Sequence, residues 1–519
     1  MGLVLSTGCA KAPVESSAPE ERVVPLPTEI DGIDSSKLVP SDKTQNCRKA
    51  PALATAAKNS EEPLVKGGFY GTYDWAAGKT NGGQLWKTRL AYVKSSLAQM
   101  RIMPSFSKIG NVSTQVKLAQ KDNSDAYING DFFQLRGTNL LYSAMVYNNE
   151  LVYAPSNRTE IVGVVEEPAN EHTGIQGKSF IKASGVKIEA QGLNLVYLAA
   201  DAVGVYNNLK TTTGLPEISY VVKVTDGVVT SSEPATAFSI PKDSKSLVIV
   251  GRGSGTTALS ALKKGDSVTY EAPNNATTTR FLRTGLRANG SVVLPSGKSI
   301  SIRGVNHDGI RASKGVVLFT QKLFSKTSKL GATVVTDLDG NVLSFYKSGR
   351  AVTVKPGQYV LQVGSAVAKA FAGLKVGSKL TINNTFAIKK KLPLAAAFGD
   401  RENTMINGVI VADCSPGHED IRPRTAIGWN ENGDVWFATT TMGVRNSADI
   451  FNRFRVGGST VHQLTAWLKQ LGATQAVSVD GGGSTTMYVK QPSNKYLRLD
   501  LPATEWVRTV PQGITMVAR

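Results

Sequence analysis

The chain has 519 residues, 41% of them hydrophobic, which is enough for roughly two to four packed domains. No apolar run reaches the ~18 residues that a membrane-spanning helix needs. The formal net charge of +19 favours a polyanionic partner, but the basic residues are scattered and no nucleic-acid-binding module is present, which argues against nucleic acid. We therefore expect a phosphorylated glycan or cell-wall polymer as the partner.

Residues 1–63 differ in composition from the rest of the chain. They contain no aromatic residue, and their 9 acidic residues outnumber their 7 basic ones, so the basic excess lies downstream. This composition predicts a disordered linker. The stretch Leu3–Lys11 resembles the end of a bacterial lipoprotein signal with Cys9 as the lipidated residue, although its apolar part is short, as if the true start lay upstream of Met1. We expect an exported, extracellular or envelope protein with a membrane tether at Cys9.

The other two cysteines, Cys47 and Cys414, leave two alternatives open. They could form a disulfide that ties the linker to the folded core, or both could be free. The chain has no CxxC motif, and its four histidines are far apart in sequence, so no zinc site is expected.

Residues 64–185 are expected to form the first part of a discontinuous main domain. Short runs of Val, Thr and Ile that end at Gly, Asn or Asp predict many strands here and throughout the chain. A short helix is predicted over residues 112–122 and a strand over residues 126–128. That strand leads into the sequence Asn129-Gly130-Asp131-Phe132-Phe133.

An internal repeat with a period of about 112 residues occupies the middle of the chain. It predicts two β-rich modules, at residues 186–297 and 298–392, and the second copy looks like an insertion. Asp-Gly turns between alternating apolar residues predict hairpins in each copy. The matched segments are 192–194 with 304–306, 224–229 with 337–342, 246–251 with 359–364, and 262–266 with 374–378.

Residues 393–519 are expected to complete the main domain. Residues 425–429 and 435–438 predict two strands joined by a hairpin turn. A helix is predicted over residues 460–471, with Ser459 as its N-cap and Gly472 after its end. The next strand, residues 476–479, would present Asp480 at its tip.

The sequence Asp480-Gly481-Gly482-Gly483-Ser484-Thr485 follows that strand. A strand tip can aim a carboxylate into a cleft, and successive glycine N–H groups can form an anion-binding nest. A tight turn that Asp480 merely caps would have a similar sequence. The first alternative predicts a phosphorylated or sugar ligand.

Two loops share one design, a buried strand followed by a polar residue, glycine and a carboxylate. One presents Asp131 and the other Asp480, while Arg424 enters a strand between them in sequence. Two carboxylates with an arginine suit cleavage of a glycosyl phosphodiester, because the guanidinium binds phosphate and a carboxylate acts on the sugar side. Alternatively, Asp131 and Asp480 could bind a divalent cation such as Ca²⁺ or Mg²⁺.

These motifs together resemble those of the phosphodiester glycosidase family. The resemblance rests on residues 129–133, on Pro423–Gly428, on Asp480–Met487 and on residues 508–511. It covers the chain from about residue 64 to 519 and implies a strand-rich α+β catalytic domain with the duplicated module inserted in it. The chain departs from the family where Met442-Gly443-Val444-Arg445 lacks an aspartate, and where Gln463 replaces a glutamate.

The resemblance implies a site at which Asp480 is catalytic or binds a metal and Arg424 binds phosphate. His418, in a polar loop before Arg424, is a candidate ligand, although a solvated loop histidine would look the same. The complete expected site consists of catalytic Asp480, Asp131, Asn129 and Arg424, and of substrate- or phosphate-binding Gly481, Gly482, Gly483, Ser484, Thr485, Thr425, Arg445 and His418.

The resulting hypothesis is an exported hydrolase that cleaves a sugar-1-phosphate ester in an envelope or extracellular glycan. One alternative is a non-catalytic cell-wall or glycan-binding protein, suggested by the missing aspartate near Arg445. The other is a glycosidase that acts on a phosphate-free polysaccharide.

Overall fold

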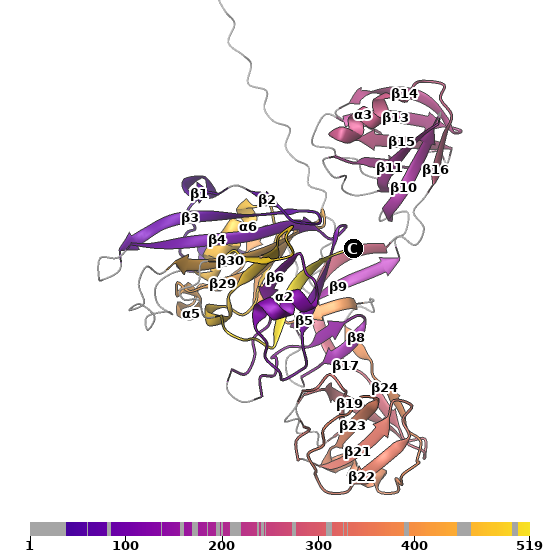
Figure 1. The fold of residues 1–519 in the computed structure, drawn as a ribbon, viewed down its shortest axis with the longest axis vertical. Coiled ribbons are helices and arrows are strands. Elements are labelled where there is room, and N and C mark those ends of the chain that lie inside the picture. Colours follow the sequence, from indigo (N-terminus) through magenta and orange to yellow (C-terminus); the bar gives the residue numbers. More distant parts are fainter. Residues whose placement is uncertain are drawn as a thin grey trace, which may run out of the picture.

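The computed structural model describes residues 38–519 with internal gaps, and the chain has a strand-rich α+β fold, as predicted (Figure 1). Cys9 and Arg445 lie outside the described residues. The segments left out after residue 38 are 60, 80–84, 136–137, 156–159, 169–174, 184, 194–197, 199–200, 208–218, 236–237, 240–242, 244, 272–276, 308–313, 325, 330, 389–393, 444–457 and 501–506.

A nine-stranded sheet forms the centre of the main domain. Its strand order is β1-β3-β4-β30-β29-β31-β27-β28, and β2 pairs with β3. Its strands come from both ends of the chain: β1 (Ala57–Lys58), β2 (Glu62–Pro63), β3 (Phe69–Lys79), β4 (Leu85–Ser96), β27 (Glu402–Ile406), β28 (Val409–Ile410), β29 (Arg424–Trp429), β30 (Asp434–Gly443) and β31 (Gln475–Ser478).

Two further sheets complete the main domain. The five-stranded sheet has the order β33-β32-β6-β34-β5 and the six-stranded sheet the order β25-β17-β9-β26-β7-β8. The strands of the first are β5 (Met100–Phe106), β6 (Ala126–Asn129), β32 (Met487–Lys490), β33 (Tyr496–Arg498) and β34 (Gln512–Ala518); those of the second are β7 (Met145–Tyr147), β8 (Glu150–Tyr153), β9 (Glu160–Pro168), β17 (Thr277–Ala288), β25 (Phe386–Ile388) and β26 (Leu394–Phe398).

The nine-stranded sheet is buried on both faces, because both sets of alternating side chains in its central strands are apolar. Ile427 and Phe437 pack with residues of the other two sheets, whereas their neighbours Ala426 and Trp436 face α6 (Val461–Gln470). Trp467 of α6 stacks on Trp75 with ring centres 4.6 Å apart. This double burial holds the ends of β29 and β31 in fixed positions.

Helix α6 begins one residue later than the sequence predicted. Its N-cap is Thr460, which forms a capping box with Gln463, while Ser459 is buried and bonds Thr440. The helix stops before Gly472, whose φ of +104° suits glycine, as expected. The remaining helices are short: α1 (Ser41–Thr44), η2 (Leu53–Thr55), α2 (Gln115–Lys121), α5 (Pro416–Glu419) and η5 (Gly482–Ser484).

The prediction of a disordered linker is wrong for the described part of residues 38–63. This segment lies across α6 and β28: Trp467 Nε1 donates to Pro51 O at 2.8 Å, and Ser41 Oγ donates to Ile410 O at 3.1 Å. Cys47 and Cys414 form a disulfide, which decides between the two alternatives. Composition suggested disorder because the segment has no aromatic residue of its own and packs instead against aromatic side chains such as Trp467 of α6.

The two repeated modules contain seven-stranded sheets of matching order. The first runs β14-β13-β15-β12-β11-β10-β16 and the second β22-β21-β23-β20-β19-β18-β24, and each has one parallel pair, β11 with β12 and β19 with β20. Duplication of one module would explain the corresponding strand orders, and this duplication remains a prediction. The elements are β10 (Ile175–Ala183), β11 (Val186–Leu193), β12 (Val203–Tyr206), β13 (Ser219–Thr225), β14 (Val228–Ala235), β15 (Ser246–Gly251), α3 (Ser254–Ser260) and β16 (Val268–Glu271); and β18 (Ser291–Val293), β19 (Ser299–Val305), β20 (Val316–Phe319), β21 (Ala332–Asp337), β22 (Val342–Tyr346), β23 (Gln358–Val363), η3 (Ser365–Val367), α4 (Ala368–Phe371) and β24 (Thr381–Asn383).

The module boundaries differ from the predicted residues 186–297 and 298–392. The first module begins at Ile175, and β17 returns to the main domain before the second module begins at Ser291. The second module shares an apolar core with the six-stranded sheet, whereas the first has clusters of its own and stands apart in Figure 1. The copy that looked like an insertion is therefore the one built into the main domain.

Within the part of the chain that the structure describes, no helix has the length and apolar character that a bilayer crossing requires.

Replacing both cysteines, as Cys47→Ala with Cys414→Ala, should lower the free energy of unfolding by ~2–4 kcal/mol, because the disulfide closes a long loop. Chemical denaturation of the oxidised proteins measures this loss. A thiol reductant should bring the wild type to the same stability and leave the double variant unchanged. Equal stability of the two oxidised proteins would contradict the prediction.

Candidate active site

Three loops distant in sequence meet at the end of β31. Antiparallel pairing of β29 with β31 sets Ala426 opposite Ser478, so the start of β29 lies beside the residues that follow β31. Asp480 N donates to Gly130 O at 3.0 Å, and Gly482 N donates to Pro423 O at 2.8 Å. These bonds join the two carboxylate loops and the segment before Arg424, as the sequence motifs implied.

Asn129 connects these loops through its buried side-chain amide. Its Nδ2 donates to Asp480 O at 2.5 Å, and its Oδ1 accepts from Thr425 Oγ1 at 2.7 Å and from Thr486 N at 3.3 Å. Donor and acceptor sides of the amide are thus both engaged within the protein. Asn129 holds the site together in this structure, and its predicted contact with substrate would require one of these bonds to change.

Asp480 lies partly buried at the tip of β31. Burial raises the pKa of its carboxyl to about 6, while hydrogen bonds from Ser484 and Gly481 N and the positive charges of Arg508 and Arg401 oppose that rise. Gly481 N donates to Oδ1 at 2.8 Å. The carboxyl is therefore mostly ionised at neutral pH but close enough to its pKa to exchange a proton.

The glycine loop fixes Asp480 through bonds within the protein, and its role as an anion nest stays a prediction. The N–H groups of Gly481, Gly482, Ser484 and Thr485 all donate to acceptors of the protein. Gly482 has a φ of +60°, and a Cβ on Gly481 would lie 2.9 Å from Pro423 O, so the loop needs glycine for its shape. Positive charge for an anion must therefore come mainly from side chains.

Asp131 is buried and its carboxylate accepts two backbone N–H groups. Oδ1 accepts from Phe132 N at 2.7 Å and Oδ2 from Ser143 N at 2.8 Å. These bonds make it the cap of its own turn, and its catalytic role remains a prediction without support from the geometry. Among the described residues, the clustered set of His, Cys, Asp and Glu that could hold a metal is Cys47, Cys414 and His462, two of which form the disulfide.

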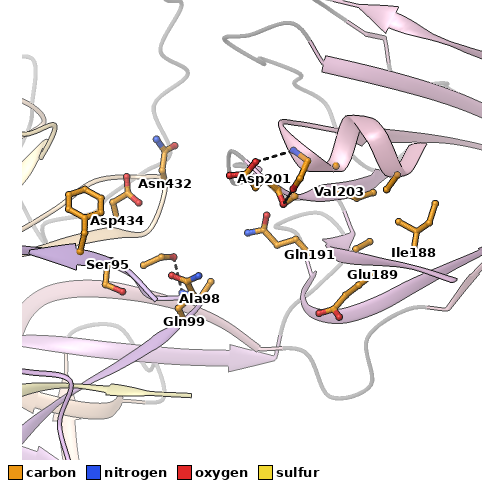
Figure 2. A pocket seen from close by; sticks show the side chains of 18 of the residues that line it. Ser95, Ala98, Gln99, Ile188, Glu189, Gln191, Asp201, Val203, Asn432 and Asp434 are labelled. Atoms are coloured by element: carbon orange, nitrogen blue, oxygen red, sulfur yellow. Dashed lines mark hydrogen bonds between the residues drawn. The ribbon is translucent and has the colours of Figure 1, made fainter. Parts of the chain in front are cut away.

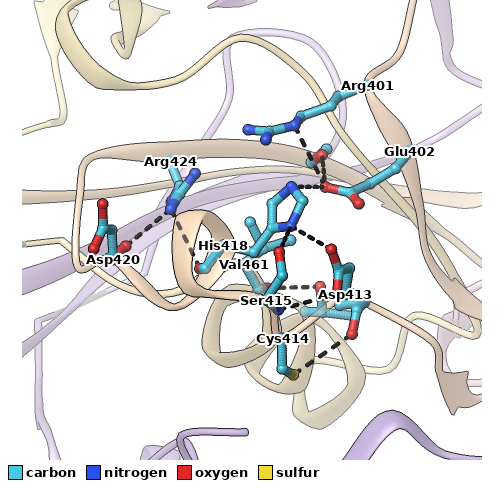
Figure 3. Close-up of polar contacts among 12 residues, drawn as sticks. Arg401, Glu402, Asp413, Cys414, Ser415, His418, Asp420, Arg424 and Val461 are labelled. Atoms are coloured by element: carbon cyan, nitrogen blue, oxygen red, sulfur yellow. Dashed lines mark hydrogen bonds and ion pairs between the residues drawn. The ribbon is translucent and has the colours of Figure 1, made fainter. Parts of the chain in front are cut away.

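Arg424 is almost fully buried at the start of β29 and is anchored by backbone carbonyls (Figure 3). Its Nη2 donates to Asp420 O at 2.8 Å and to His418 O at 3.3 Å, and its Nε donates to Ser459 O at 3.3 Å. Burial and the neighbouring charges of Arg401 and Arg422 lower the pKa of its guanidinium to about 10. Arg424 thus braces the α5 loop and also brings positive charge to the site.

His418 joins the α5 loop to β27 and is not a solvated loop histidine. Its Nδ1 lies 2.8 Å from Asp413 Oδ2 and 3.0 Å from Ser415 Oγ, and its Nε2 lies 3.3 Å from Glu402 Oε1 (Figure 3). The Nε2 contact has the distance of an ion pair without hydrogen-bond geometry. The imidazole therefore positions the loop that holds Arg424.

Two arginines of the site were absent from the expected set. Arg508 Nη1 donates to Ser484 Oγ at 3.4 Å and lies against Gly483, and its motif was noted without a role. Arg401 precedes β27 and follows Gly399 and Asp400, with no motif to mark it. The pairing of β27 with β31 places Arg401 next to the site, where its backbone N–H donates to Ser478 O.

A small cavity lies at this site, lined by Arg401, Arg424, Thr425, Ser478 and Gly481. Its volume of about 10 Å³ is the space of about one water molecule. A cavity of this size is too small to hold a sugar.

A much larger cavity, of about 1100 Å³, lies between the main domain and the first module (Figure 2). It contains none of the expected site residues and lies at the opposite end of β29 and β30 from Arg424. Of the expected site residues, Arg424, Thr425 and Gly481 line the small cavity. The larger cavity is lined in part by Ser95, Gln99, Glu189, Gln191, Asn432 and Asp434.

Solved structures are similar to this chain at low sequence identity, and the first named here shares its fold. A candidate exported protein of Burkholderia pseudomallei K96243 is 12% identical, with a TM-score of 0.53, and the match covers 90% of this chain and 98% of that one. The catalytic domain of zebrafish N-acetylglucosamine-1-phosphodiester alpha-N-acetylglucosaminidase, auto-inhibited by its pro-peptide, is 10% identical, with a TM-score of 0.30 and coverage of 89% and 87%. A hypothetical protein from Synechocystis is 13% identical, with a TM-score of 0.36 and coverage of 88% and 64%.

Among curated proteins, none matches the chain at a significant level. The family model described as phosphodiester glycosidase matches residues 331–517, which include β29, β31 and the loop after Asp480. The motifs that suggested this family therefore lie within the matched segment, apart from residues 129–133. This segment of the chain is therefore similar to the phosphodiester glycosidase family.

Proposed function

We propose that the protein is a hydrolase that cleaves a glycosyl phosphodiester and releases the sugar from its phosphate. The observation that carries this proposal is the Asp480 carboxyl, whose pKa is about 6, within reach of the charges of Arg508 and Arg401. A carboxylate beside cationic groups suits a substrate that combines a sugar with an anion. Similarity to the phosphodiester glycosidase family supports the same reaction class.

In this proposal Asp480 acts as the ionised carboxylate on the sugar side, as nucleophile or as general base toward water. The bond between the anomeric carbon and the phosphoryl oxygen breaks, and the phosphate monoester leaves with the bonding electron pair. The anomeric carbon gains a bond to the oxygen of water, whose proton passes to Asp480. If Asp480 is the nucleophile, the anomeric carbon first bonds its carboxylate oxygen, and water then cleaves this ester to release the sugar. Phosphate is a weak base, so the departing oxygen needs little help from a general acid. The guanidinium groups stabilise the negative charge that grows on this oxygen.

The proposed setting is the cell envelope or the extracellular space, with a phosphorylated glycan as substrate. The lipoprotein-like start at Cys9, the disulfide between Cys47 and Cys414, and the fold shared with a candidate exported protein support export. The basic surface favours an anionic polymer. The expected cation at Asp131 and Asp480 remains a proposal, and assays with Ca²⁺, with Mg²⁺ and with a chelator address it.

The Asp480→Asn variant should lose about a thousandfold in kcat/KM toward a synthetic sugar-1-phosphodiester, because the amide cannot act as base or nucleophile. Release of reducing sugar by the full chain measures this loss. Asp131→Asn is the matched control, and its kcat/KM should fall less than about tenfold. Its melting temperature should fall, because the single amide oxygen can accept only one of the two backbone N–H bonds that the carboxylate accepts.

Equal loss of activity in both variants at unchanged stability would restore Asp131 to a catalytic role. No turnover by the wild type across several sugars, with or without phosphate, would move the assignment to a glycan-binding protein. Turnover of phosphate-free glycans alone would favour a polysaccharide glycosidase.

The raised pKa of Asp480 predicts a pH dependence of stability. Folding favours the protonated carboxyl, so its contribution is complete below the unfolded pKa of 3.8 and is lost as the pH rises through about 6. The free energy of unfolding of Asp480→Asn, relative to wild type, should therefore increase by up to ~3 kcal/mol between pH 4 and pH 7. Denaturant titrations at several pH values measure this difference, and a difference that does not vary with pH would contradict the raised pKa.

A further inference from the structure

Arg401 lies at the mouth of the small cavity, opposite Arg424 and next to the residues that present Asp480. Both arginines line the cavity, and Figure 3 shows Arg424 beside Asp420 and Arg401 beside Glu402. We propose that Arg401 binds the phosphoryl group of the substrate at this mouth, with Arg424 behind it as a second source of positive charge. This proposal rests on the proposed function and names the residue that recognises the anion.

The first argument is the supply of donors. The N–H groups of Gly481, Gly482, Ser484 and Thr485 are used within the protein, and Nε and Nη2 of Arg424 donate to backbone carbonyls. Arg401 is more accessible: its side chain is 34% exposed, whereas Arg424 is 8% exposed. Of the two cavity-lining guanidinium groups, Arg401 is therefore the one that a ligand outside the cavity reaches first.

The second argument is charge. The charge of Arg401 acts on both Arg424 and Asp480, so the guanidinium groups repel one another across the cavity. Glu402 compensates only in part, because its Oε1 lies 3.7 Å from Arg401 Nε and is shared with His418. An anion that contacts Arg401 would relieve this repulsion, and the cavity that both arginines line has a volume of about 10 Å³, the space of about one water molecule.

The third argument is rigidity. A Cβ on Gly399 would lie 2.4 Å from Asp131 Oδ2, so the backbone before Arg401 packs directly on a buried carboxylate. Asp400 is fully buried and accepts from Arg283 Nε at 2.6 Å. The Arg401 guanidinium carbon lies 5.4 Å from the centre of the Phe132 ring, which orients its planar fork. A fixed, planar guanidinium matches phosphoryl oxygens better than a mobile ammonium does.

The test compares Arg401→Gln and Arg401→Lys with the wild type and with Arg350→Gln. Arg350 is the matched control, because it also lies over an aromatic ring, 4.8 Å from the centre of Tyr346, but in the second module. Binding of inorganic phosphate to the full chain is measured by calorimetry, beside kcat/KM for the sugar-1-phosphodiester. Melting temperatures confirm that each variant is folded.

We expect Arg401→Gln to weaken phosphate binding about tenfold and to lower kcat/KM about a hundredfold, since charge-assisted bonds to the leaving phosphate strengthen in the transition state. Arg401→Lys should show an intermediate loss, because it keeps the charge and loses the fork. Arg350→Gln should behave as wild type.

Phosphate that binds the folded Arg401→Gln variant as tightly as it binds wild type would overturn the proposal, as would wild type that binds no phosphate. Phosphate binding that depends on Arg401 in a protein without glycosidase turnover would uphold the anion site and reject only the proposed reaction. The calorimetric result therefore separates the two proposals.

Discussion

The candidate site depends on one buried amide. Asn129 bonds the backbone after β31 through its Nδ2, and the start of β29 and the residue before β32 through its Oδ1. No apolar contact could join three loops at one point with this directional accuracy, and the amide donates from its nitrogen while its oxygen accepts two bonds. Asn129 ends β6 of the five-stranded sheet and bonds Thr425 of β29 in the nine-stranded sheet, so the relative position of the two sheets and that of Asp480 are set together.

Cationic side chains surround this amide, and nearby backbone N–H groups donate to acceptors within the protein. The glycine loop bonds itself and its neighbours, Arg424 braces the α5 loop, and His418 ties that loop to Glu402. Such an arrangement is rigid before any ligand arrives, so little conformational entropy is lost on binding. The arginines repel one another, and the packing of the folded core must offset this unfavourable electrostatic energy.

The sequence predicted those parts of the fold that local patterns determine. The strands before Asn129 and Asp480, the β29–β30 hairpin and helix α6 all have clear periodicity and clear end signals, and the structure has each within a few residues of its expected place. The meeting of the motif loops followed from their shared design. The duties of individual groups did not follow, since Asp131 and Asp480 occupy equivalent places in sequence and differ only in which N–H groups surround them. Residues 38–63 and Arg401 escaped prediction for a related reason, because their packing partners lie hundreds of residues away and leave no local pattern.

The distribution of the main domain along the chain also constrains the order in which the protein can fold during synthesis. Strands β3 and β4 are made early, yet their neighbour β30 and the partner of Cys47 follow more than three hundred residues later. Both modules are complete before that point, so each can close its own sheet while the early strands still lack their neighbours. The exposed edge of β4 must therefore stay unpaired for most of translation, and a nascent chain is most exposed to aggregation or chaperone capture in that interval.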